Sequence, residues 1–292
     1  NTVKESYYYA ISKPLKRNQK LSFRIVTNAT LLTSEIIDFI AEHDIGIGIS
    51  LDGGKYIQDL QRPLANGKSS FDEAIKFMPD LLSKIPYANA RGTYFTFDYP
   101  LVDIYRELFD VGFKIVDVPP DLLNIKNKEE AIKMVKQIES LYELLMEDVS
   151  NLGHLRIGLI KTHIMRIFTH RYECSAGCGP GEAILAVDPS GNFYPCHRFI
   201  SNSEIIGSIS DGLVKKNCFD FSKVDQICSK CWNRYTCSHG CYYNNFDQTG
   251  DPYKRHEYWC MYSKKMTEVS LAVSAHAPDL AIRKILNLEG NS

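Results

Sequence analysis

The chain has 292 residues, of which 44% are hydrophobic and 24% charged, which is the composition of an ordinary globular protein. Its formal net charge of −1 gives no electrostatic reason to expect nucleic acid or an acidic membrane surface as a partner. It has no apolar run of about 18 residues, and no apolar segment follows the polar opening, so we expect neither a membrane span nor a signal peptide. The opening also lacks Met, and we expect the sequence to begin partway through a longer protein.

The first half of the chain alternates strand patterns with helix patterns. Runs rich in β-branched and aromatic residues predict four strands, at residues 22–27, 45–51, 91–97 and 113–118. Amphipathic patterns predict helices between them, one opened by a Thr33 or Ser34 cap and others at residues 71–82 and 101–111. Such alternation indicates a parallel sheet with right-handed crossovers. Four units do not close a barrel, which again suggests that strands precede Asn1.

The second half begins with the longest predicted helix, residues 129–149, whose apolar stripe is typical of a core-facing helix. A further helix at residues 153–169 is expected to bridge to the tail. Residues 262–273 and 279–286 are predicted to close the chain as helices.

All nine cysteines lie between positions 174 and 260, and the 173 residues before them contain none. A secreted disulfide scaffold would be short, loop-rich and preceded by a signal peptide. A cysteine-free α/β region followed by a cysteine-dense tail favours metal binding in a reducing compartment. We therefore expect a cytoplasmic protein that works in an anaerobic or reducing environment.

The spacing of the cysteines is regular. Cys228-x2-Cys231-x5-Cys237-x3-Cys241 is followed by Cys260, and upstream a Gly-x4-Cys runs from Gly191 to Cys196. Cys178 and Cys174 precede it. Thiolates at such spacings are the usual ligands of iron–sulfur clusters and of structural zinc. From spacing alone, both kinds of site remain open, and so do disulfides.

This cysteine pattern resembles the SPASM domain of radical S-adenosylmethionine (SAM) enzymes. Residues 25–32 (IVTNATLL), 49–53 (ISLDG) and 91–95 (RGTYF) resemble strands three to five of the radical SAM partial (β/α)6 barrel. The resemblance implies an α/β fold: the C-terminal portion of such a barrel followed by a small cysteine-rich SPASM iron–sulfur domain. We expect barrel strands three to six within residues 1–155, the SPASM domain with its bridging helix at 156–273, and a C-terminal helix and tail at 274–292.

The resemblance also implies which cysteines act together, because SPASM ligands interleave. The inner auxiliary [4Fe–4S] cluster would be held by Cys178, Cys196 and Cys241 with Cys174, and the outer one by Cys228, Cys231, Cys237 and Cys260. Cys218 fits no motif position and is expected to be an idle thiol. The CxxxCxxC motif for the catalytic cluster is absent from these residues, so SAM and a third [4Fe–4S] cluster are expected only in the complete enzyme.

Several other residues have positions that the resemblance makes interesting. Asn28, Ser50 and Asp52 lie at the C-terminal ends of predicted strands, where relatives contact SAM, and Arg91 lies where an Arg could bind a carboxylate. The alternative is loop capping by Asn and Asp and an ordinary surface Arg. His197 follows Cys196, where sulfatase-maturating relatives carry an Asp that acts as a base, and it is a candidate catalytic residue or a structural one.

Residues 192–200 (NFYPCHRFI), together with Cys231-Trp232, are more similar to the peptide maturases that make sactipeptides and ranthipeptides. The expected function is therefore a radical SAM oxidoreductase that joins a Cys sulfur to a carbon within a ribosomally made precursor peptide. The alternatives are an anaerobic sulfatase-maturating enzyme, another SPASM peptide-modifying enzyme, or a non-catalytic zinc-binding module. The expected partners are a leader-bearing precursor peptide and an electron donor such as flavodoxin or ferredoxin, with no nucleic acid and no membrane.

Overall fold

We describe the protein from a computed structural model. The described residues are 2–14, 19–169, 177–200, 205–216, 218–223, 226–237 and 239–286. Their contacts form two compact units. The first consists of Asn1–Tyr94, Tyr99–Pro119 and Arg156–Gly158, and the second of Phe95–Asp98, Pro120–Leu155 and Leu159–Ser292.

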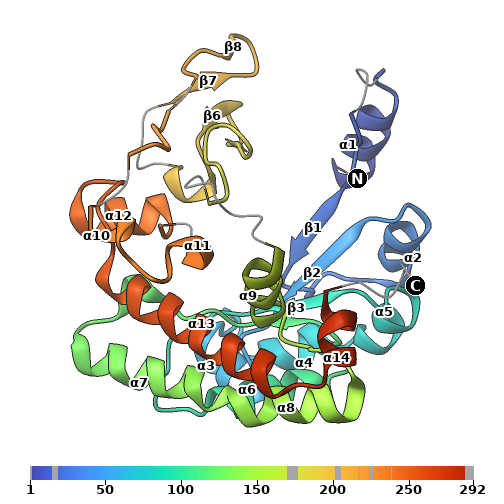
Figure 1. Cartoon of the computed structure of the whole chain (residues 1–292). Coiled ribbons are helices and arrows are strands. Elements are labelled where there is room, and N and C mark those ends of the chain that lie inside the picture. Colours follow the sequence, from blue (N-terminus) through green and yellow to red (C-terminus); the bar gives the residue numbers. More distant parts are fainter. Residues whose placement is uncertain are drawn as a thin grey trace. The chain divides into compact units, whose positions relative to one another are not determined.

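The first unit is built on a parallel sheet in the order β1-β2-β3-β4, as expected from the alternating pattern (Figure 1). Its strands are β1 (Arg24–Thr27), β2 (Gly46–Ser50), β3 (Asn89–Arg91) and β4 (Val116–Asp117). In the central strand β2, Ile47 and Ile49 are buried, and Ile49 pairs with Ala90 of β3. The predicted third strand is wrong in its bounds, because β3 already ends at Arg91. Beyond it, Gly92 and Tyr94 still donate hydrogen bonds to the chain around β4, but β2 has ended.

Six helices accompany this sheet in the described part of the first unit: α1 (Thr2–Ile11), α2 (Ser34–Glu42), α3 (Lys55–Gln61), α4 (Ser70–Ile75), α5 (Met78–Lys84) and α6 (Leu101–Asp110). The predicted cap of α2 is present, since Thr33 Oγ1 accepts a hydrogen bond from the Ile36 N–H at 3.3 Å. The single helix predicted at 71–82 is wrong. Pro79 lies in the first turn of α5, where its missing N–H is tolerated, so the chain breaks near Phe77. Helix α3 was not predicted.

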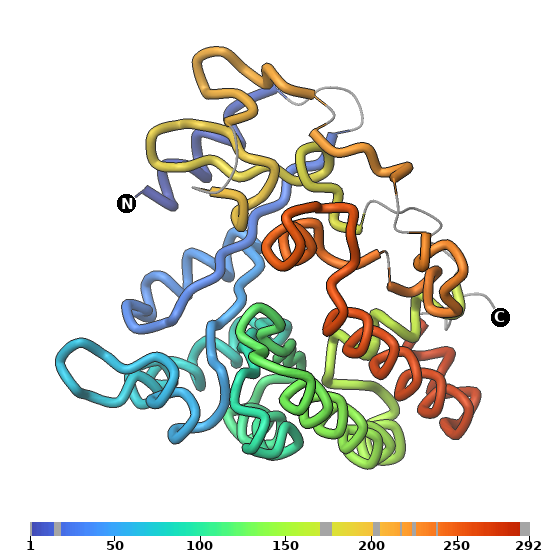
Figure 2. The backbone as a smooth tube through the Cα atoms, turned by 90° about the vertical axis from the view of Figure 1, so that its left-hand side faces the viewer, coloured from blue at the N-terminus to red at the C-terminus, as the bar shows by residue number. Residues whose placement is uncertain are grey.

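The larger helices of the second unit are α7 (Lys128–Glu139), α8 (Leu141–Leu152), α9 (Gly158–Thr169), α13 (Glu257–His276) and α14 (Asp279–Ile285), with a short 3-10 turn η1 (Leu122–Asn124). The single helix predicted at 129–149 is wrong: it breaks at Ser140, whose Oγ donates to the Gln137 carbonyl at 2.8 Å. Helix α13 packs along α7 and α8, as both views show (Figures 1 and 2). It begins five residues before the predicted start.

Short elements fill the cysteine-rich part of the second unit. Four short strands form an antiparallel sheet in the order β5-β6-β7-β8: β5 (Ala186–Val187), β6 (Asn192–Tyr194), β7 (Gly207–Ser208) and β8 (Gly212–Leu213). Short helical segments follow or interrupt them: η2 (His197–Phe199), α10 (Gln226–Ser229), α11 (Arg234–Cys237) and α12 (Tyr242–Thr249). None of these was predicted, because two to eight residues carry too little periodicity to read.

The two units do not follow the expected domain boundaries. Helices α7 and α8, which we expected to belong with the barrel, have their contacts with α13 and belong to the second unit. The division at residues 155 and 273 therefore remains a proposal about folding domains. Among the described residues, no helix combines the length and the apolar character needed to cross a membrane.

Candidate metal centre

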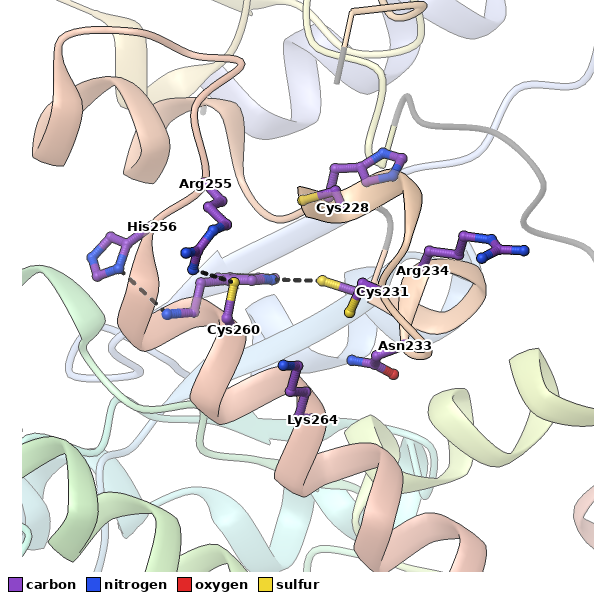
Figure 3. Close-up of a pocket in the computed structure, with 11 residues that line it drawn as sticks. Cys228, Cys231, Asn233, Arg234, Arg255, His256, Cys260 and Lys264 are labelled. Atoms are coloured by element: carbon purple, nitrogen blue, oxygen red, sulfur yellow. Dashed lines mark hydrogen bonds between the residues drawn. The ribbon is translucent and has the colours of Figure 1, made fainter. Parts of the chain in front are cut away.

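The four cysteines expected to hold the outer cluster line one cavity of the second unit (Figure 3). Cys228 lies in α10, Cys231 follows that helix, and Cys237 ends α11. Cys260 lies in the first turn of α13 and is brought to the others from more than twenty residues further along the chain. We call these four residues the outer set.

Hydrogen-bond donors are aimed at two sulfurs of the outer set. The indole Nε1 of Trp259 donates to Cys237 Sγ at 3.3 Å, and a guanidinium nitrogen of Arg255 donates to Cys260 Sγ at 3.9 Å. Arg234 and Lys264 also line the cavity, and no acidic side chain among the described residues does. The cavity is therefore suited to a group with negative charge and sulfur ligands.

The first turn of α13 is itself fixed in place. His256 is buried, and its Nδ1 accepts hydrogen bonds from the backbone N–H groups of Tyr258 and Trp259 at 3.1 and 3.4 Å. This cap satisfies two N–H groups that have no partner within the helix. Burial raises the pKa of the Cys260 thiol above its ordinary value, as does the neighbouring Cys237, while Arg255 and Lys264 act in the opposite direction.

A second group of thiols consists of Cys178, Cys196 and Cys241, three of the residues expected at the inner cluster. Burial raises the pKa of Cys178, and the nearby Cys241 and Cys196 thiols raise it further. Cys196 is buried at the start of η2, and Cys241 is the residue before α12. We call these three residues the inner set. The expected fourth member, Cys174, lies outside the described residues.

A sharp reversal of the backbone separates the two sets. His239 has φ of +60° and Gly240 has φ of +93°, both in the left-handed region. A Cβ at Gly240 would lie 3.2 Å from Cδ1 of Trp259, so a glycine suits this turn in two ways. The reversal lets Cys237 join the outer set and Cys241 the inner set. Cys218 makes a different contact, since its Sγ donates to the Lys215 carbonyl at 3.4 Å.

The outer cavity fits an iron–sulfur cluster on its own features. Four thiols surround one cavity, N–H donors point at two of the sulfurs, and the rim is basic, which are the ligand type and surroundings of such clusters. Among the described residues, no group of three or more His, Cys, Asp or Glu side chains is arranged to hold a single metal ion. The assignment of the individual ligands remains a proposal.

The residues expected to contact SAM lie at the C-terminal ends of neighbouring strands. Ser50 ends β2 and pairs in register with Arg91, which ends β3. Asn28 follows β1, and its Oδ1 accepts from the N–H and the hydroxyl of Thr30 at 3.3 and 3.0 Å. This is the loop-capping role that was the alternative for Asn28.

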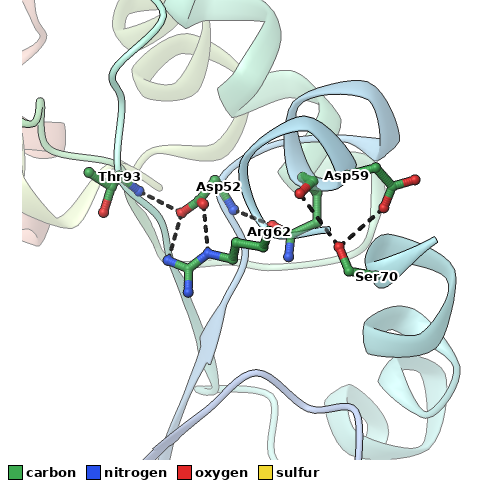
Figure 4. Close-up of polar contacts among 6 residues, drawn as sticks. Asp52, Asp59, Arg62, Ser70 and Thr93 are labelled. Atoms are coloured by element: carbon green, nitrogen blue, oxygen red, sulfur yellow. Dashed lines mark hydrogen bonds and ion pairs between the residues drawn. The ribbon is translucent and has the colours of Figure 1, made fainter. Parts of the chain in front are cut away.

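Asp52 is almost fully buried, and its carboxylate is already engaged (Figure 4). Arg62 donates to both oxygens, at 2.6 and 3.0 Å, and the Thr93 N–H donates to one of them at 2.8 Å. Three N–H donors within the chain therefore already bind this carboxylate, as the loop-capping alternative expects. The SAM contact of Ser50, Asn28, Asp52 and Arg91 remains a prediction. The exposed His197 opens η2, and its catalytic role is likewise untested.

Sequence reasoning missed the residues around the thiols. Trp259 and Arg255 do not belong to the cysteine pattern, and only the packing of α13 brings them to the outer set. The adjacency of Trp259 to Cys260 was the one available signal, and adjacency says nothing of which sulfur an indole reaches.

Comparison with known proteins places this geometry in context. No protein-family model matches the chain. It is 29% identical over 230 residues to an uncharacterised protein of Methanocaldococcus jannaschii, covering 78% of this chain and 70% of that protein. It is 24% identical over 258 residues to the cysteine-type anaerobic sulfatase-maturating enzyme of Clostridium perfringens, and 22% identical over 281 residues to the serine-type enzyme of Bacteroides thetaiotaomicron. These matches cover 77% and 86% of this chain but only 65% and 68% of the two enzymes.

Solved structures agree with these relatives. The structure of anSMEcpe with bound AdoMet aligns with a TM-score of 0.77 at 20% identity, covering 99% of this chain and 81% of that one. The same protein with AdoMet and a peptide bound also gives 0.77, covering 98% and 82%. The chain has the radical SAM fold of these enzymes. The expected α/β fold class is thus confirmed.

The relatives belong to the expected class of enzyme, radical SAM oxidoreductases with SPASM-type auxiliary clusters that act on peptides. The finer expectation of thioether formation is not shown by these relatives, since the named ones are sulfatase-maturating enzymes, which was the stated alternative.

Proposed function

We propose that this chain is the auxiliary-cluster part of a radical SAM enzyme that oxidises a residue within a peptide or protein substrate. The observation that carries the proposal is the sorting of seven cysteines into two groups, with Cys237 beside Cys260 and Cys241 beside Cys178 and Cys196. Two thiolate sites of this kind suit two iron–sulfur clusters. Because the chain spans about two thirds of its relatives' length, the activity belongs to the complete protein.

The residues of this chain would supply positions and electrostatics. Clusters held by the two sets would supply one-electron chemistry when bound. The outer set offers four thiolates with N–H donors and basic side chains beside them. The inner set offers three from the described residues, and Cys174 is proposed as a fourth ligand. At the sheet edge, Ser50 and Arg91 are proposed to contact SAM, which is supported by their position at the ends of neighbouring strands.

The substrate class follows from the relatives. We favour a Cys or Ser residue of a sulfatase, because the names of the related enzymes state both types. Thioether formation in a ribosomal precursor peptide is the second candidate. A specific feature favours it, namely His197 at the position where sulfatase maturases carry the Asp that acts as a base. Either reaction removes electrons from the substrate, so a flavodoxin or ferredoxin is a fitting redox partner.

The deciding experiment uses the complete enzyme with SAM and dithionite under anaerobic conditions. The first substrate is a sulfatase-derived peptide with Cys at its centre, tested beside its Cys→Ser and Cys→Ala variants. The second substrate is a Cys-rich precursor peptide. Tandem mass spectrometry should find a change confined to the single Cys or Ser residue, with none in the Ala peptide. A crosslink between two residues of the precursor peptide would decide for the thioether reaction. Zinc without acid-labile sulfide in the purified protein would overturn both and favour a zinc-binding module.

A further inference from the structure

We propose that Trp259 and Arg255 raise the reduction potential of the cluster held by the outer set, by donating hydrogen bonds to its ligand sulfurs. The proposal rests on the function proposed above, because it requires a cluster at the outer set. The proposal gives Trp259 and Arg255, which lie outside the cysteine pattern, a role in setting the potential of the outer cluster.

The indole of Trp259 is held where it can donate to sulfur. Its Nε1 lies 3.3 Å from Cys237 Sγ, and an indole N–H can only donate a hydrogen bond. Its ring contacts the ring of Tyr262 edge-on, with centroids 5.8 Å apart. On another side, Gly240 leaves room for the ring that no other residue would leave without a shift. The direction of this hydrogen bond is thus built into the packing.

Arg255 adds charge as well as a donor. Its guanidinium lies 3.9 Å from Cys260 Sγ, and Arg234 and Lys264 line the same cavity. With no acidic side chain among the described lining residues, three cations lie near the outer set. The outer set therefore sits in a positive field.

Reduction adds one electron to the cluster and makes it one unit more negative, with part of the added charge on the thiolate sulfurs. Hydrogen bonds and positive charges at those sulfurs stabilise the reduced form more than the oxidised form, which raises the potential. The electron comes from dithionite in a titration and, in the proposed reaction, from the substrate as it is oxidised. A raised reduction potential makes the cluster held by the outer set a better acceptor of that electron.

The test is a redox titration of the cluster-loaded full chain, followed by electron paramagnetic resonance. At the potential where half of the wild-type outer cluster is reduced, Trp259→Phe should lower the ratio of reduced to oxidised cluster about fivefold, the effect of one hydrogen bond. Trp232→Phe is the matched control. Trp232 is the only other tryptophan, follows Cys231 and is exposed, and its replacement should change nothing. The potential of the inner cluster should also stay constant in both variants.

Arg255 variants separate charge from hydrogen bonding. Arg255→Gln should lower the potential further than Arg255→Lys, which keeps the positive charge. An unchanged outer potential in Trp259→Phe, with full iron content, would overturn the proposal. Absence of any reducible cluster in the wild-type protein would instead refute the proposed function.

If Trp259→Phe loses iron, its potential cannot be compared with that of the wild type. A second measurement therefore uses proteins that keep Trp259. Protein with nitrogen-15 in its indole rings should show a nitrogen hyperfine coupling to the reduced outer cluster, both in the wild type and in Trp232→Phe. Lack of that coupling in a protein with full iron content would contradict the contact between Trp259 and Cys237 and so the proposal.

Discussion

Cys237 and Cys241 are four residues apart, yet their thiols lie with different groups of cysteines. Cys237 ends α11 within the outer cavity, and Cys241 lies close enough to Cys178 to raise its pKa. The two left-handed residues His239 and Gly240 turn the chain between them. Two cysteines that are close in sequence therefore belong to different sets, and each shares its set with cysteines far away in the chain.

This arrangement predicts how paired cysteine substitutions combine. Loaded protein should contain about eight irons, four at each site. Cys237→Ala with Cys260→Ala should remove about four, because both belong to the outer set. Cys237→Ala with Cys241→Ala should impair both sites and leave far fewer. Iron and acid-labile sulfide analysis after anaerobic reconstitution measures both.

Cys218→Ala serves as the control and should leave the iron content unchanged, since its sulfur donates to the Lys215 carbonyl. Cys174→Ala should reduce only the inner site. Equal iron loss in the two double variants would refute the sorting of the cysteines.

Metal removal should affect the cysteine-rich segments before the rest of the chain. Their described elements are strands of two or three residues and helices of three to eight, which bury little apolar surface of their own. We expect chelation or long exposure to air to open residues 177–241 to protease. The sheet β1–β4 and the pairing of α13 with α7 should persist, since they rest on buried apolar side chains. Hydrogen exchange with and without metal locates the change, and protection of 177–241 in the metal-free protein would contradict it.

The Asp52–Arg62 pair predicts a loss of stability when its outer partner is removed. Arg62→Ala leaves the buried carboxylate with the Thr93 N–H, and should lower the free energy of unfolding by about 2 kcal/mol. Because the Arg62 side chain is 41% exposed, water can enter and limit the loss. Lys55→Ala breaks an exposed ion pair with Asp72 and is the control that should leave the denaturation midpoint unchanged.

A variant of Asp52 itself tests the expected SAM contact. If the carboxylate is structural, Asp52→Asn in the complete enzyme should lower stability and leave SAM affinity intact by calorimetry. A large loss of SAM affinity at unchanged stability would return Asp52 to the SAM site.

His163 predicts a dependence of stability on pH. Burial, with a smaller effect of Arg166, lowers the pKa of His163 from 6.5 to about 4. Between those values the unfolded state binds a proton that the folded state does not, so the free energy of unfolding falls as pH falls. The fall contributed by this residue should approach about 3 kcal/mol by pH 4 and should level off below it. His163→Leu should remove this slope in denaturation curves measured between pH 4 and 7. An unchanged slope would show that His163 is protonated in the fold.

The sequence was most informative where a short pattern determines a local structure. β-branched runs predicted the four parallel strands, and Thr33 marked the start of α2. The helix breaks at Ser140 and near Pro79 were missed because an apolar stripe continues through both, although Pro79 was a readable signal. Apolar periodicity reports which face is buried and says little about whether the backbone stays continuous.

The candidate site divides in the same way. The resemblance of the cysteine pattern to SPASM domains was enough to propose which thiols gather, whereas spacing alone left the kind of site open. It could not give the bond from Trp259 to Cys237, which depends on a turn at Gly240 and on where α13 begins. Nor could it show that Arg62 occupies the Asp52 carboxylate, since a strand-end Asp looks the same whether it awaits a ligand or closes a loop.

Helix α13 takes part both in the proposed metal site and in the apolar packing of the second unit. Its first turn carries Cys260, further along Met266, Val269 and Val273 are buried, and the helix packs against α7 and α8. Apolar packing needs no metal, so α13 can dock during synthesis before any iron arrives and present Cys260 at a settled position. The short segments with Cys228 and Cys231 then close over the incoming cluster. We therefore expect an order of maturation in which the helix comes first, the metal second and the loops last.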